Sequence, residues 1–370
     1  MQFERFVAIG DSQSEGLLDP DGRGGYRGWA DRFAEILAGT SPHVQYANLA
    51  VRGKLIGAIR AEQLDVALGM KPDIATVMGG LNDLLRPGFD ADATVAHLDA
   101  MLAALRETGA TVLTNTFPDL AEIAPVLRRL APRVVAYNDG IREVARTHGA
   151  LLVDFADRGV GTDLRIWSPD RIHANPLGHA LIAAAFADTV GVRGYEDWSD
   201  PLPVRPPIGA VRRVGGEARW LGGTVVPWLL RRARGRSSGD GITAKRPRLV
   251  PVASVFHLVA PDAWPGTGWY RPESLAAEGF VHLSFGDQVA GSANRHYADA
   301  PALAVVELDP AALAAPLVVE DSYGRGTAFP HVYGAVPVSA AVAVHELRRD
   351  GTGAWAFSPG AAAAAASPDR

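Results

Sequence analysis

Four separate points of the sequence carry residues that suit acyl transfer. Ser12 follows a short apolar run in Gly-Asp-Ser, Gly53 ends Asn-Leu-Ala-Val-Arg-Gly, and Asn82 lies in Gly-Gly-Leu-Asn-Asp. Further on, Asp170 precedes His173 by three residues. A serine hydroxyl becomes a good nucleophile only when a base takes its proton, and an imidazole titrates in the right range for that task. A carboxylate orients the imidazole, and N–H donors stabilise negative charge on the substrate oxygen. The set therefore contains every group that a serine hydrolase needs.

The stretches between these points alternate between strand-like and helix-like patterns. After the first apolar run, short β-rich runs predict strands at 44–49, 73–78, 111–117 and 150–155. Amphipathic stretches predict helices at 29–37, 55–68, 94–107, 125–148 and 176–190. This alternation predicts five parallel strands covered on both faces, which is a three-layer α/β/α domain. Because ligands bind at the carboxyl ends of such strands, the four points should meet at one rim of the sheet.

The motifs in residues 5–190 resemble those of an SGNH (GDSL-type) hydrolase. Its four blocks occur in order as GDSQSEG, NLAVRG, GGLND and DRIH. The resemblance implies a flavodoxin-like α/β/α sandwich that hydrolyses carboxylic esters or related acyl bonds. By motif position it makes Ser12 the nucleophile, His173 the general base and Asp170 the group that orients His173. It also implies an oxyanion hole formed by the N–H groups of Ser12 and Gly53 with the amide of Asn82. This chemistry needs no metal and no organic cofactor.

Other residues near or outside these blocks have alternative interpretations. His179 lies six residues after His173 and is the rival candidate for the base. Residues 235–239 fit G-x-S-x-G, but that motif needs a preceding strand and a following helix. Here it lies in a stretch rich in Arg, Gly and Ser, so we interpret it as fortuitous. Asp11 and Asp83 are expected to support turns.

The sequence leaves the substrate class open. Several apolar residues flank the four points and predict either an apolar rim for a short or medium acyl chain or part of the core: Leu17, Leu18, Leu84, Leu85, Phe117, Pro118 and Trp167. We expect a small-molecule acyl ester as the substrate. Thioesters, acetylated sugars and lipid esters all fit, and the same groups can transfer an acyl chain to another alcohol instead of water.

Composition limits the class of protein. The chain has 370 residues, which favours two domains, and a formal net charge of −5, which gives no reason to expect nucleic acid binding. Cysteine is absent, which excludes disulfides and fits a reducing compartment. The first apolar run is as short as a strand and lacks a basic leader, so we expect a cytoplasmic protein.

Changes in composition predict the domain organisation. We expect a hydrolase domain at 1–195, a basic linker rich in Pro, Arg and Gly at 196–250, an accessory α+β domain at 251–358, and a disordered tail at 359–370. The linker contains Trp220 and Trp228. Either these tryptophans pack back on the hydrolase domain, or the basic segment makes weak contact with an anionic membrane surface.

Residues 252–345 resemble a small bacterial domain family that has no assigned function. The matching motifs are VFH at 255–257, YRPESL at 270–275, EGFVHLS at 278–284 and FPHVYG at 329–334, together with Trp264. A distant similarity to the ADP-ribosyltransferase-like fold would imply a pocket for a dinucleotide such as NAD. The residues that would fill this pocket are His257, His282, Ser284, Glu320 and His331. Alternatively, these polar residues only satisfy hydrogen bonds at strand ends.

Two functions of different classes follow. The first is a serine esterase or acyl hydrolase that works through an acyl-Ser12 intermediate. The alternative is a binding protein in which the hydrolase fold is catalytically silent and the C-terminal domain recognises a nucleotide-like ligand. The complete set of nucleophile, base and oxyanion donors favours the esterase.

Overall fold

A computed structural model describes residues 2–22, 24–204 and 238–358. The interpretations made above for Trp220 and Trp228, for the start of the 235–239 motif and for the tail at 359–370 concern residues outside these ranges.

The chain divides into two compact units. Unit 1 comprises Met1–Ser41 and Tyr46–Leu249, and unit 2 comprises Pro42–Gln45 and Val250–Arg370. The two units are described separately below.

The centre of unit 1 is a six-stranded sheet with the order β5-β4-β3-β1-β2-β6. Its strands are β1 (Arg5–Gly10), β2 (Gln45–Asn48), β3 (Ile74–Met78), β4 (Thr111–Asn115), β5 (Leu151–Val153) and β6 (Arg246–Pro251). β3 pairs in parallel with β1 and β4, and β4 pairs in parallel with β5. On the other side of β1, the N–H groups of Leu49 and Val51 donate to the carbonyl oxygens of Ala8 and Gly10. The predicted parallel α/β sheet is confirmed.

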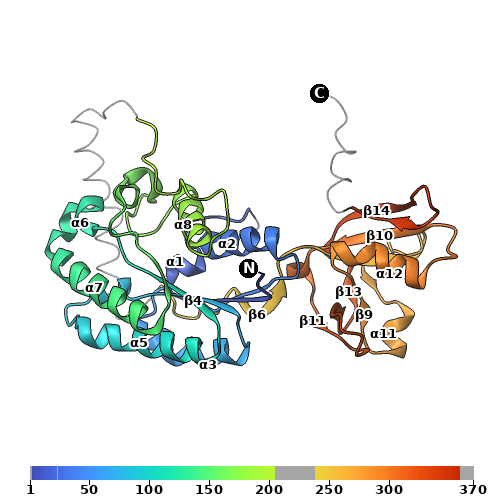
Figure 1. The fold of residues 1–370 in the computed structure, drawn as a ribbon, viewed down its shortest axis with the longest axis horizontal. Helices are drawn as coiled ribbons and strands as arrows, with labels where there is room; N and C mark the ends of the chain where they lie inside the picture. Colours follow the sequence, from blue (N-terminus) through green and yellow to red (C-terminus); the bar gives the residue numbers. More distant parts are fainter. Residues whose placement is uncertain (1, 23, 205–237, 359–370) are drawn as a thin grey trace. The chain divides into compact units, whose positions relative to one another are not determined.

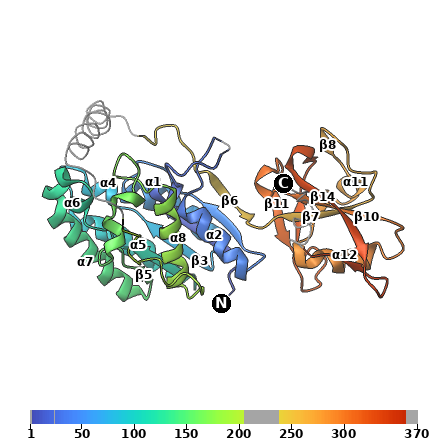
Figure 2. The same cartoon turned by 90° about the horizontal axis from the view of Figure 1, so that it is seen from above.

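Helices cover both faces of this sheet (Figure 1). They are α1 (Ser12–Glu15), α2 (Gly28–Thr40), α3 (Ile56–Gly69), α4 (Leu81–Leu84), α5 (Ala91–Glu107), α6 (Leu120–Ile123), α7 (Ala131–His148) and α8 (Pro176–Thr189). α2 packs on α8 on one face, and α5 packs on α3 and α7 on the other (Figures 1 and 2). Between α2 and α8 the rings of Trp29 and Phe186 stack, and their centres are 4.3 Å apart. The three predicted layers are therefore present.

One predicted helix is interrupted. The amphipathic stretch at 125–148 begins with a 3₁₀ turn over Pro125–Leu130, and the α-helix α7 starts only at Ala131. Pro132 lies in the first turn of α7. A proline has no backbone N–H and is tolerated where a helix starts but not in its interior, so the helix begins anew at this point.

The point at which the order of connected strands reverses lies beside β1. From β1 the chain passes to β2 on one side of the sheet, and it then crosses to β3 on the other side. In open α/β sheets the crevice at such a switch point is where ligands bind. Ser12 directly follows β1, and Asn82 follows β3 after a Gly-Gly pair. These two residues thus start from neighbouring strand ends.

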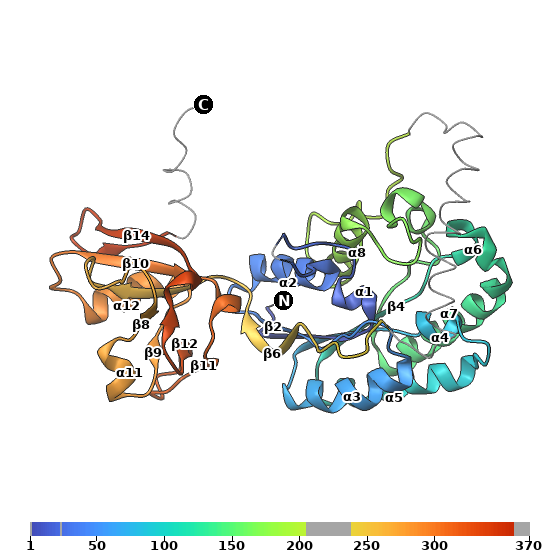
Figure 3. The same ribbon diagram turned by 180° about the vertical axis from the view of Figure 1, so that it is seen from behind.

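The sixth strand was not predicted from the sequence. β6 lies beside β2 at the edge of the sheet (Figure 3). Just before it, Lys245 donates to the carbonyl oxygens of Tyr26 and Arg27 and forms an ion pair with Asp31 that is largely buried. At the other end of the expected linker, the indole of Trp198 is buried and donates to Asp188 at 3.2 Å. Both described ends of the 196–250 segment therefore pack within unit 1.

Unit 2 is an α+β domain with antiparallel strands, as expected. Its strands are β7 (Val255–Val259), β8 (Trp269–Tyr270), β9 (Val281–His282), β10 (Leu303–Leu308), β11 (Leu317–Glu320), β12 (Phe329–Val332), β13 (Val336–Pro337), β14 (Ala341–Arg349) and β15 (Trp355–Ala356), and its helices are α11 (Glu273–Ala277) and α12 (Val289–His296). The strands form sheets ordered β15-β14-β10-β7, β11-β12-β9 and β13-β8.

None of the helices within the described ranges has the length and apolar character needed to cross a membrane. The cytoplasmic location stays a prediction from the sequence.

Candidate active site

Ser12 begins a single helical turn at the end of the central strand. Asp11 caps this turn, since its side chain accepts a hydrogen bond from the N–H of Gln13 at 3.2 Å. Ser12 is 8% exposed, so its hydroxyl lies at the surface of the core rather than in solvent. The Oγ of Ser12 lies 3.0 Å from Nε2 of His173. A serine at this position has a fixed backbone and one imidazole within hydrogen-bond distance.

The loop before α8 holds His173. The N–H of Ser168 donates to the carbonyl oxygen of His173 at 2.8 Å and closes the loop. Inside it, one carboxylate oxygen of Asp170 accepts from the N–H groups of Ile172 and His173, each at 3.0 Å. This Asx-type turn fixes the carboxylate before it contacts the imidazole. Asn175 then caps α8 by accepting from the N–H of Gly178.

Asp170, His173 and Ser12 form one chain of hydrogen bonds. The second carboxylate oxygen of Asp170 lies 2.6 Å from Nδ1 of His173. Because a carboxylate only accepts, Nδ1 carries the proton and Nε2 is free to accept the Ser12 hydroxyl proton. Burial acts to raise the pKa of Asp170, but its hydrogen bonds with the imidazole and backbone of His173 outweigh burial and hold that pKa below the usual value. Asp170 therefore stays ionised and can accept the hydrogen bond from Nδ1 of His173.

The three N–H donors expected for the oxyanion hole lie in the turns that follow β1, β2 and β3. The N–H of Ser12 lies at the start of α1, where no intrahelical acceptor exists. Gly53 has a φ of +75°, a left-handed conformation that favours glycine, in the loop after β2. The amide nitrogen of Asn82 lies 3.1 Å from both the carbonyl oxygen of Lys54 and a carboxylate oxygen of Asp11. The amide is thereby fixed next to the Gly53 loop and the turn that begins at Ser12.

Two side chains that follow Ser12 tie these loops together, and the sequence did not single them out. Gln13 donates to the carbonyl oxygen of Ile172 at 2.8 Å and accepts from the N–H of Ala174 at 3.3 Å. It therefore holds the backbone on both sides of His173. Glu15 accepts from the N–H of Arg52 at 2.8 Å and forms an ion pair with its guanidinium, which fixes the Gly53 loop. Only their closeness to Ser12 in the sequence could have pointed to them.

Asp11 and Asp83 support turns, as expected, and Asp11 has a further property. Asp83 accepts from the N–H of Ile56 at 3.0 Å and so joins the β3 loop to the start of α3. Asp11 is 1% exposed. Its burial raises its pKa to about 7, although the hydrogen bond from Gln13, the nearby imidazole of His173 and the amide of Asn82 act in the opposite direction.

His179, the rival candidate for the base, is hydrogen-bonded to Trp29 and Leu17 rather than to Ser12. It is fully buried, its Nδ1 accepts from the N–H of Trp29 at 3.1 Å, and its Nε2 donates to the carbonyl oxygen of Leu17 at 3.2 Å. Burial lowers its pKa to about 4, so the ring is neutral near pH 7. Both ring nitrogens are engaged with backbone, which leaves neither for proton transfer.

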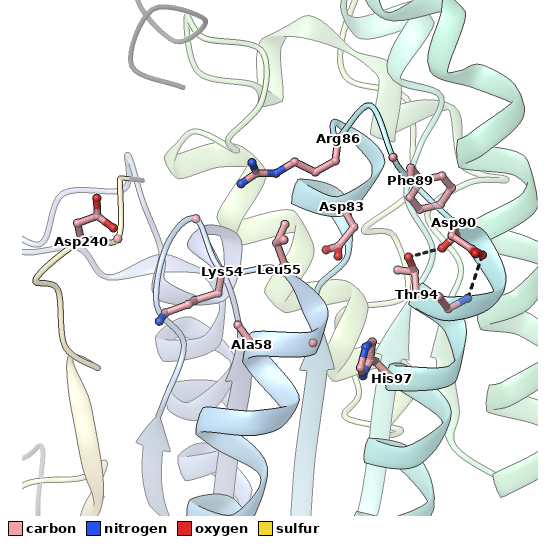
Figure 4. A pocket seen from close by; sticks show the side chains of 15 residues that line it. Lys54, Leu55, Ala58, Asp83, Arg86, Phe89, Asp90, Thr94, His97 and Asp240 are labelled. Atoms are coloured by element: carbon pink, nitrogen blue, oxygen red, sulfur yellow. Dashed lines mark hydrogen bonds between the residues drawn. The ribbon is translucent and has the colours of Figure 1, made fainter. Parts of the chain in front are cut away.

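A hollow of about 600 Å³ adjoins the Gly53 loop (Figure 4). Its wall is more apolar than polar in area, and the polar side chains on it include Lys54, Asp83, Arg86, His97 and Asp240. Ser12 and His173 do not line this hollow. Gly53, a candidate oxyanion donor, and Asp83, the neighbour of Asn82 in the sequence, do line it. Of the apolar residues considered for a substrate rim, Leu84 and Phe117 belong to the buried core instead.

In unit 2, the five polar residues singled out from the sequence line one cavity: His257, His282, Ser284, Glu320 and His331. All five side chains have hydrogen-bond partners. His257 donates from Nδ1 to the carbonyl oxygen of His282 at 2.8 Å and accepts from the Tyr270 hydroxyl at 3.1 Å. Burial lowers the pKa of His257 to about 4. The hydroxyl of Ser284 pairs with that of Ser292 at 3.1 Å.

Comparison with known proteins relates most of the two units to families. Residues 8–181 match the GDSL-like Lipase/Acylhydrolase family. Residues 258–344 match a family described as Protein of unknown function (DUF952), which confirms the expected resemblance to a small family without an assigned function. The similarity to the ADP-ribosyltransferase-like fold stays a prediction.

Individual relatives are also found. The chain is similar to an acetylxylan esterase of Geobacillus stearothermophilus, with 25% identity over 212 residues, covering 51% of this chain and 94% of that protein. Among solved structures it is similar to LAE5, an alpha/beta hydrolase enzyme from the metagenome of Lake Arreo, Spain (26% identity, TM-score 0.44, 51% of this chain and 95% of that chain). It is also similar to a catalytic mutant of Axe2, an acetylxylan esterase from Geobacillus stearothermophilus (19% identity, TM-score 0.44, 51% and 94%). From the family match, residues 8–181 belong to the GDSL-like lipase/acylhydrolase family and form a hydrolase that acts on ester bonds.

Proposed function

We propose that unit 1 is a serine esterase that cleaves a carboxylic ester through an acyl-Ser12 intermediate. The observation that carries this proposal is the continuous hydrogen-bonded chain from Asp170 through His173 to Ser12, at 2.6 and 3.0 Å. These distances lie in the range that proton transfer requires. The alternative, a catalytically silent binding protein, would not need the three groups in line.

The reaction begins when Ser12 Oγ attacks the ester carbonyl carbon. Nε2 of His173 takes the hydroxyl proton as the new C–O bond forms, and the ionised carboxylate of Asp170 stabilises the resulting imidazolium. The same Nε2 then gives its proton to the leaving alkoxide. In the second half, water loses a proton to His173 and attacks the acyl carbon; the bond to Ser12 Oγ then breaks, His173 gives its proton to Oγ, and the acid is released.

The carbonyl oxygen becomes negatively charged during both attacks. We assign its stabilisation to the N–H groups of Ser12 and Gly53 and to the amide of Asn82. Such donors act strongly because they are fixed before the reaction and because the surroundings exclude water. The contacts of Asn82 with Asp11 and Lys54 support this assignment, since they hold the amide in place without substrate.

For the substrate, we propose a small acyl group on a polar alcohol such as a sugar. Two observations support this choice. Charged side chains line part of the hollow beside Gly53, and a curated relative is named an acetylxylan esterase. A lipid ester would instead need a long apolar groove.

Covalent labelling of the reactive serine tests the proposal directly. The protein is incubated with a fluorophosphonate, which reacts with activated serine hydroxyls, and the labelled peptide is identified by mass spectrometry. We expect label on Ser12 and loss of p-nitrophenyl acetate hydrolysis in proportion to labelling. Hydrolysis that persists in fully labelled protein, or label that falls elsewhere, would refute the mechanism. A series of p-nitrophenyl esters and acetylated sugars then tests the substrate class: faster turnover of long acyl chains would contradict it.

A further inference from the structure

A short turn that lies outside the family match packs against the Gly53 loop. Residues 238–241 form this turn, in which the N–H of Ile242 donates to the carbonyl oxygen of Gly239 at 3.0 Å. The family match ends at residue 181, whereas unit 1 extends to Leu249. The turn is therefore a part of the hydrolase unit that the family comparison does not cover.

Gly239 lies directly against the backbone of Arg52. A Cβ atom added at position 239 would overlap the carbonyl oxygen of Arg52, far inside the 3.0 Å that real Cβ atoms keep from their neighbours. It would also touch the side chain of Val51. The φ of Gly239 is not in the left-handed range, so lack of space rather than backbone conformation favours glycine at this position.

The carbonyl group that Gly239 contacts belongs to the same peptide group as the N–H of Gly53. A trans peptide group is planar, so its carbonyl oxygen and its N–H point in opposite directions. The orientation of the Arg52 carbonyl therefore fixes the orientation of the Gly53 N–H, a donor of the proposed oxyanion hole. Glycine permits a wide range of φ, so this peptide group needs support from its neighbours to keep one orientation. Gly239 supplies that support on the side away from the N–H.

Glu15 holds the preceding peptide group. Its carboxylate accepts from the N–H of Arg52 at 2.8 Å and forms an ion pair with the guanidinium. The Glu15 side chain is 6% exposed, and it ends the helical turn that begins at Ser12. The backbone of Arg52 is thus held between the turn that carries the proposed nucleophile and the turn that carries Gly239.

Buried contacts anchor the chain that follows Gly239. Lys245 donates to the carbonyl oxygens of Tyr26 and Arg27, at 3.0 and 2.6 Å. It also forms an ion pair with Asp31, in which the lysine side chain is 20% exposed and the aspartate side chain 13%. Immediately afterwards β6 joins the sheet beside β2. Separating a largely buried charge from its partner is costly, so these contacts restrict where the turn at 238–241 can lie.

The same turn forms part of the hollow beside the Gly53 loop. Gly239 and Asp240 line this hollow together with Gly53 and Lys54. Figure 4 shows Asp240 on one side of the hollow and His97 on the other, each on a separate segment of the chain. A substrate in this hollow would therefore lie next to both the oxyanion donor and the turn that supports it.

We propose that Gly239 is a positioning residue for ester hydrolysis, because its backbone supports the peptide group between Arg52 and Gly53 and so aims the Gly53 N–H at the oxyanion. The inference rests on the proposed esterase function. It adds that a segment of the expected linker, far along the chain from the four motifs, completes the site.

The experiment measures hydrolysis of p-nitrophenyl acetate by full-length Gly239→Ala and Gly239→Asn. In both variants the new side chain and the Arg52 carbonyl must move apart by about 1 Å, and a displacement of that size is enough to cost up to about 10²-fold in rate. We expect kcat to fall about 10- to 100-fold, with KM within about twofold of the wild type, because the affected donor acts on charge that develops in the transition state. Unchanged kcat in both variants would overturn the inference.

Gly241→Asn is the matched control. Gly241 lies in the same turn, nothing lies within 4 Å of the place where its Cβ would be, and asparagine tolerates its φ of +76°. This variant should keep the kcat of the wild type. A loss equal to that of Gly239→Asn would mean that any change in the turn impairs the protein, and it would refute the specific role of Gly239.

A second substrate tests the oxyanion donor itself. In p-nitrophenyl thionoacetate a sulfur replaces the carbonyl oxygen, and sulfur accepts hydrogen bonds weakly. Misplacing the Gly53 N–H should slow the oxygen ester more than the sulfur ester, so the ratio of the two rates should fall in the Gly239 variants and stay constant in Gly241→Asn. Partial unfolding lowers both rates equally and leaves this ratio unchanged. A constant ratio in the Gly239 variants would refute the inference.

Failure of this inference is distinguishable from failure of the proposed esterase. A wild-type protein that hydrolyses no ester would refute both. An active wild-type protein whose Gly239 variants keep the same kcat and the same ratio of rates would refute the role of Gly239 alone.

Discussion

Nε2 of His173 lies 3.0 Å from Oγ of Ser12, although 161 residues separate them in the chain. If this contact transfers the proton, Ser12→Ala should lower kcat for p-nitrophenyl acetate by about 10³-fold or more, because the covalent route is lost. Ser14→Ala is the matched control. The Ser14 hydroxyl is buried and has no hydrogen-bond partner in the described part of the chain, so its removal should leave activity unchanged. Similar rates for Ser12→Ala and wild type would favour the silent binding protein.

The amide of Asn82 lies between the nucleophile turn and the Gly53 loop. Asn82→Ala should lower kcat by about 10²–10³ with a small change in KM, because the lost donor acts on charge that develops only in the transition state. Asn82→Asp should be at least as damaging, since it removes the donor and places a second carboxylate beside Asp11. Steady-state kinetics with separate kcat and KM test both variants. A rise in KM alone would mean that Asn82 only binds the substrate.

Gln13 joins the nucleophile turn to the His173 loop through its contacts with Ile172 and Ala174. We expect it to be a positioning residue. Gln13→Ala should lower kcat while the protein stays folded, and Gln13→Glu should retain part of the activity, because a carboxylate can still accept from the N–H of Ala174.

A double-mutant cycle separates positioning of the base from a general effect of Gln13 on the fold. In a His173→Ala background the base is absent, so Gln13→Ala should have little further effect on the residual rate. The same fold reduction in both backgrounds would show that Gln13 acts independently of His173.

His179 should affect stability rather than chemistry. His179→Gln should lower the free energy of unfolding by about 1–3 kcal/mol, because a buried backbone partner at Trp29 or Leu17 loses its hydrogen bond. Esterase kcat should stay close to that of the wild type. A loss of activity comparable to that of Ser12→Ala would instead make His179 a participant in the reaction.

The same substitution should change how stability depends on pH. The pKa of His179 falls from 6.5 to about 4 on folding, so below pH 6.5 the unfolded chain binds a proton that the folded protein does not. The contribution of His179 is fully present above pH 6.5 and is lost as the pH falls toward 4. Denaturant unfolding of wild type and variant between these pH values should show the difference in stability shrinking as the pH falls. A constant difference would contradict the buried neutral imidazole.

The sequence predicted the parts of unit 1 whose signals are local. Short β-branched runs marked the strands, and Ser12, Gly53, Asn82 and His173 each followed such a run or preceded the last helix. β6 gave no such signal, because Arg246–Pro251 contains two prolines and two arginines and reads as linker. Proline is tolerated in strands at a sheet edge, where a missing N–H donor does no harm.

Contacts between distant segments could not be read from spacing. The residue type of Gln13 does not indicate that it holds Ile172, 159 positions later. In unit 2, the pairing of Glu320 with His331 depends on the β11-β12 hairpin, which residue spacing does not reveal. The sequence indicated the candidate reacting groups more readily than the residues that position them.

The position of β6 decides where the gene can be divided. A fragment that stops at residue 195 would lose Lys245 and leave the buried carboxylate of Asp31 without its counter-ion, and it would also uncover the backbone edge of β2. An uncovered edge strand promotes aggregation. Protein engineers who wish to express the hydrolase domain alone should therefore keep the chain through Pro251, where β6 ends, even though the motifs of the candidate active site end at His173.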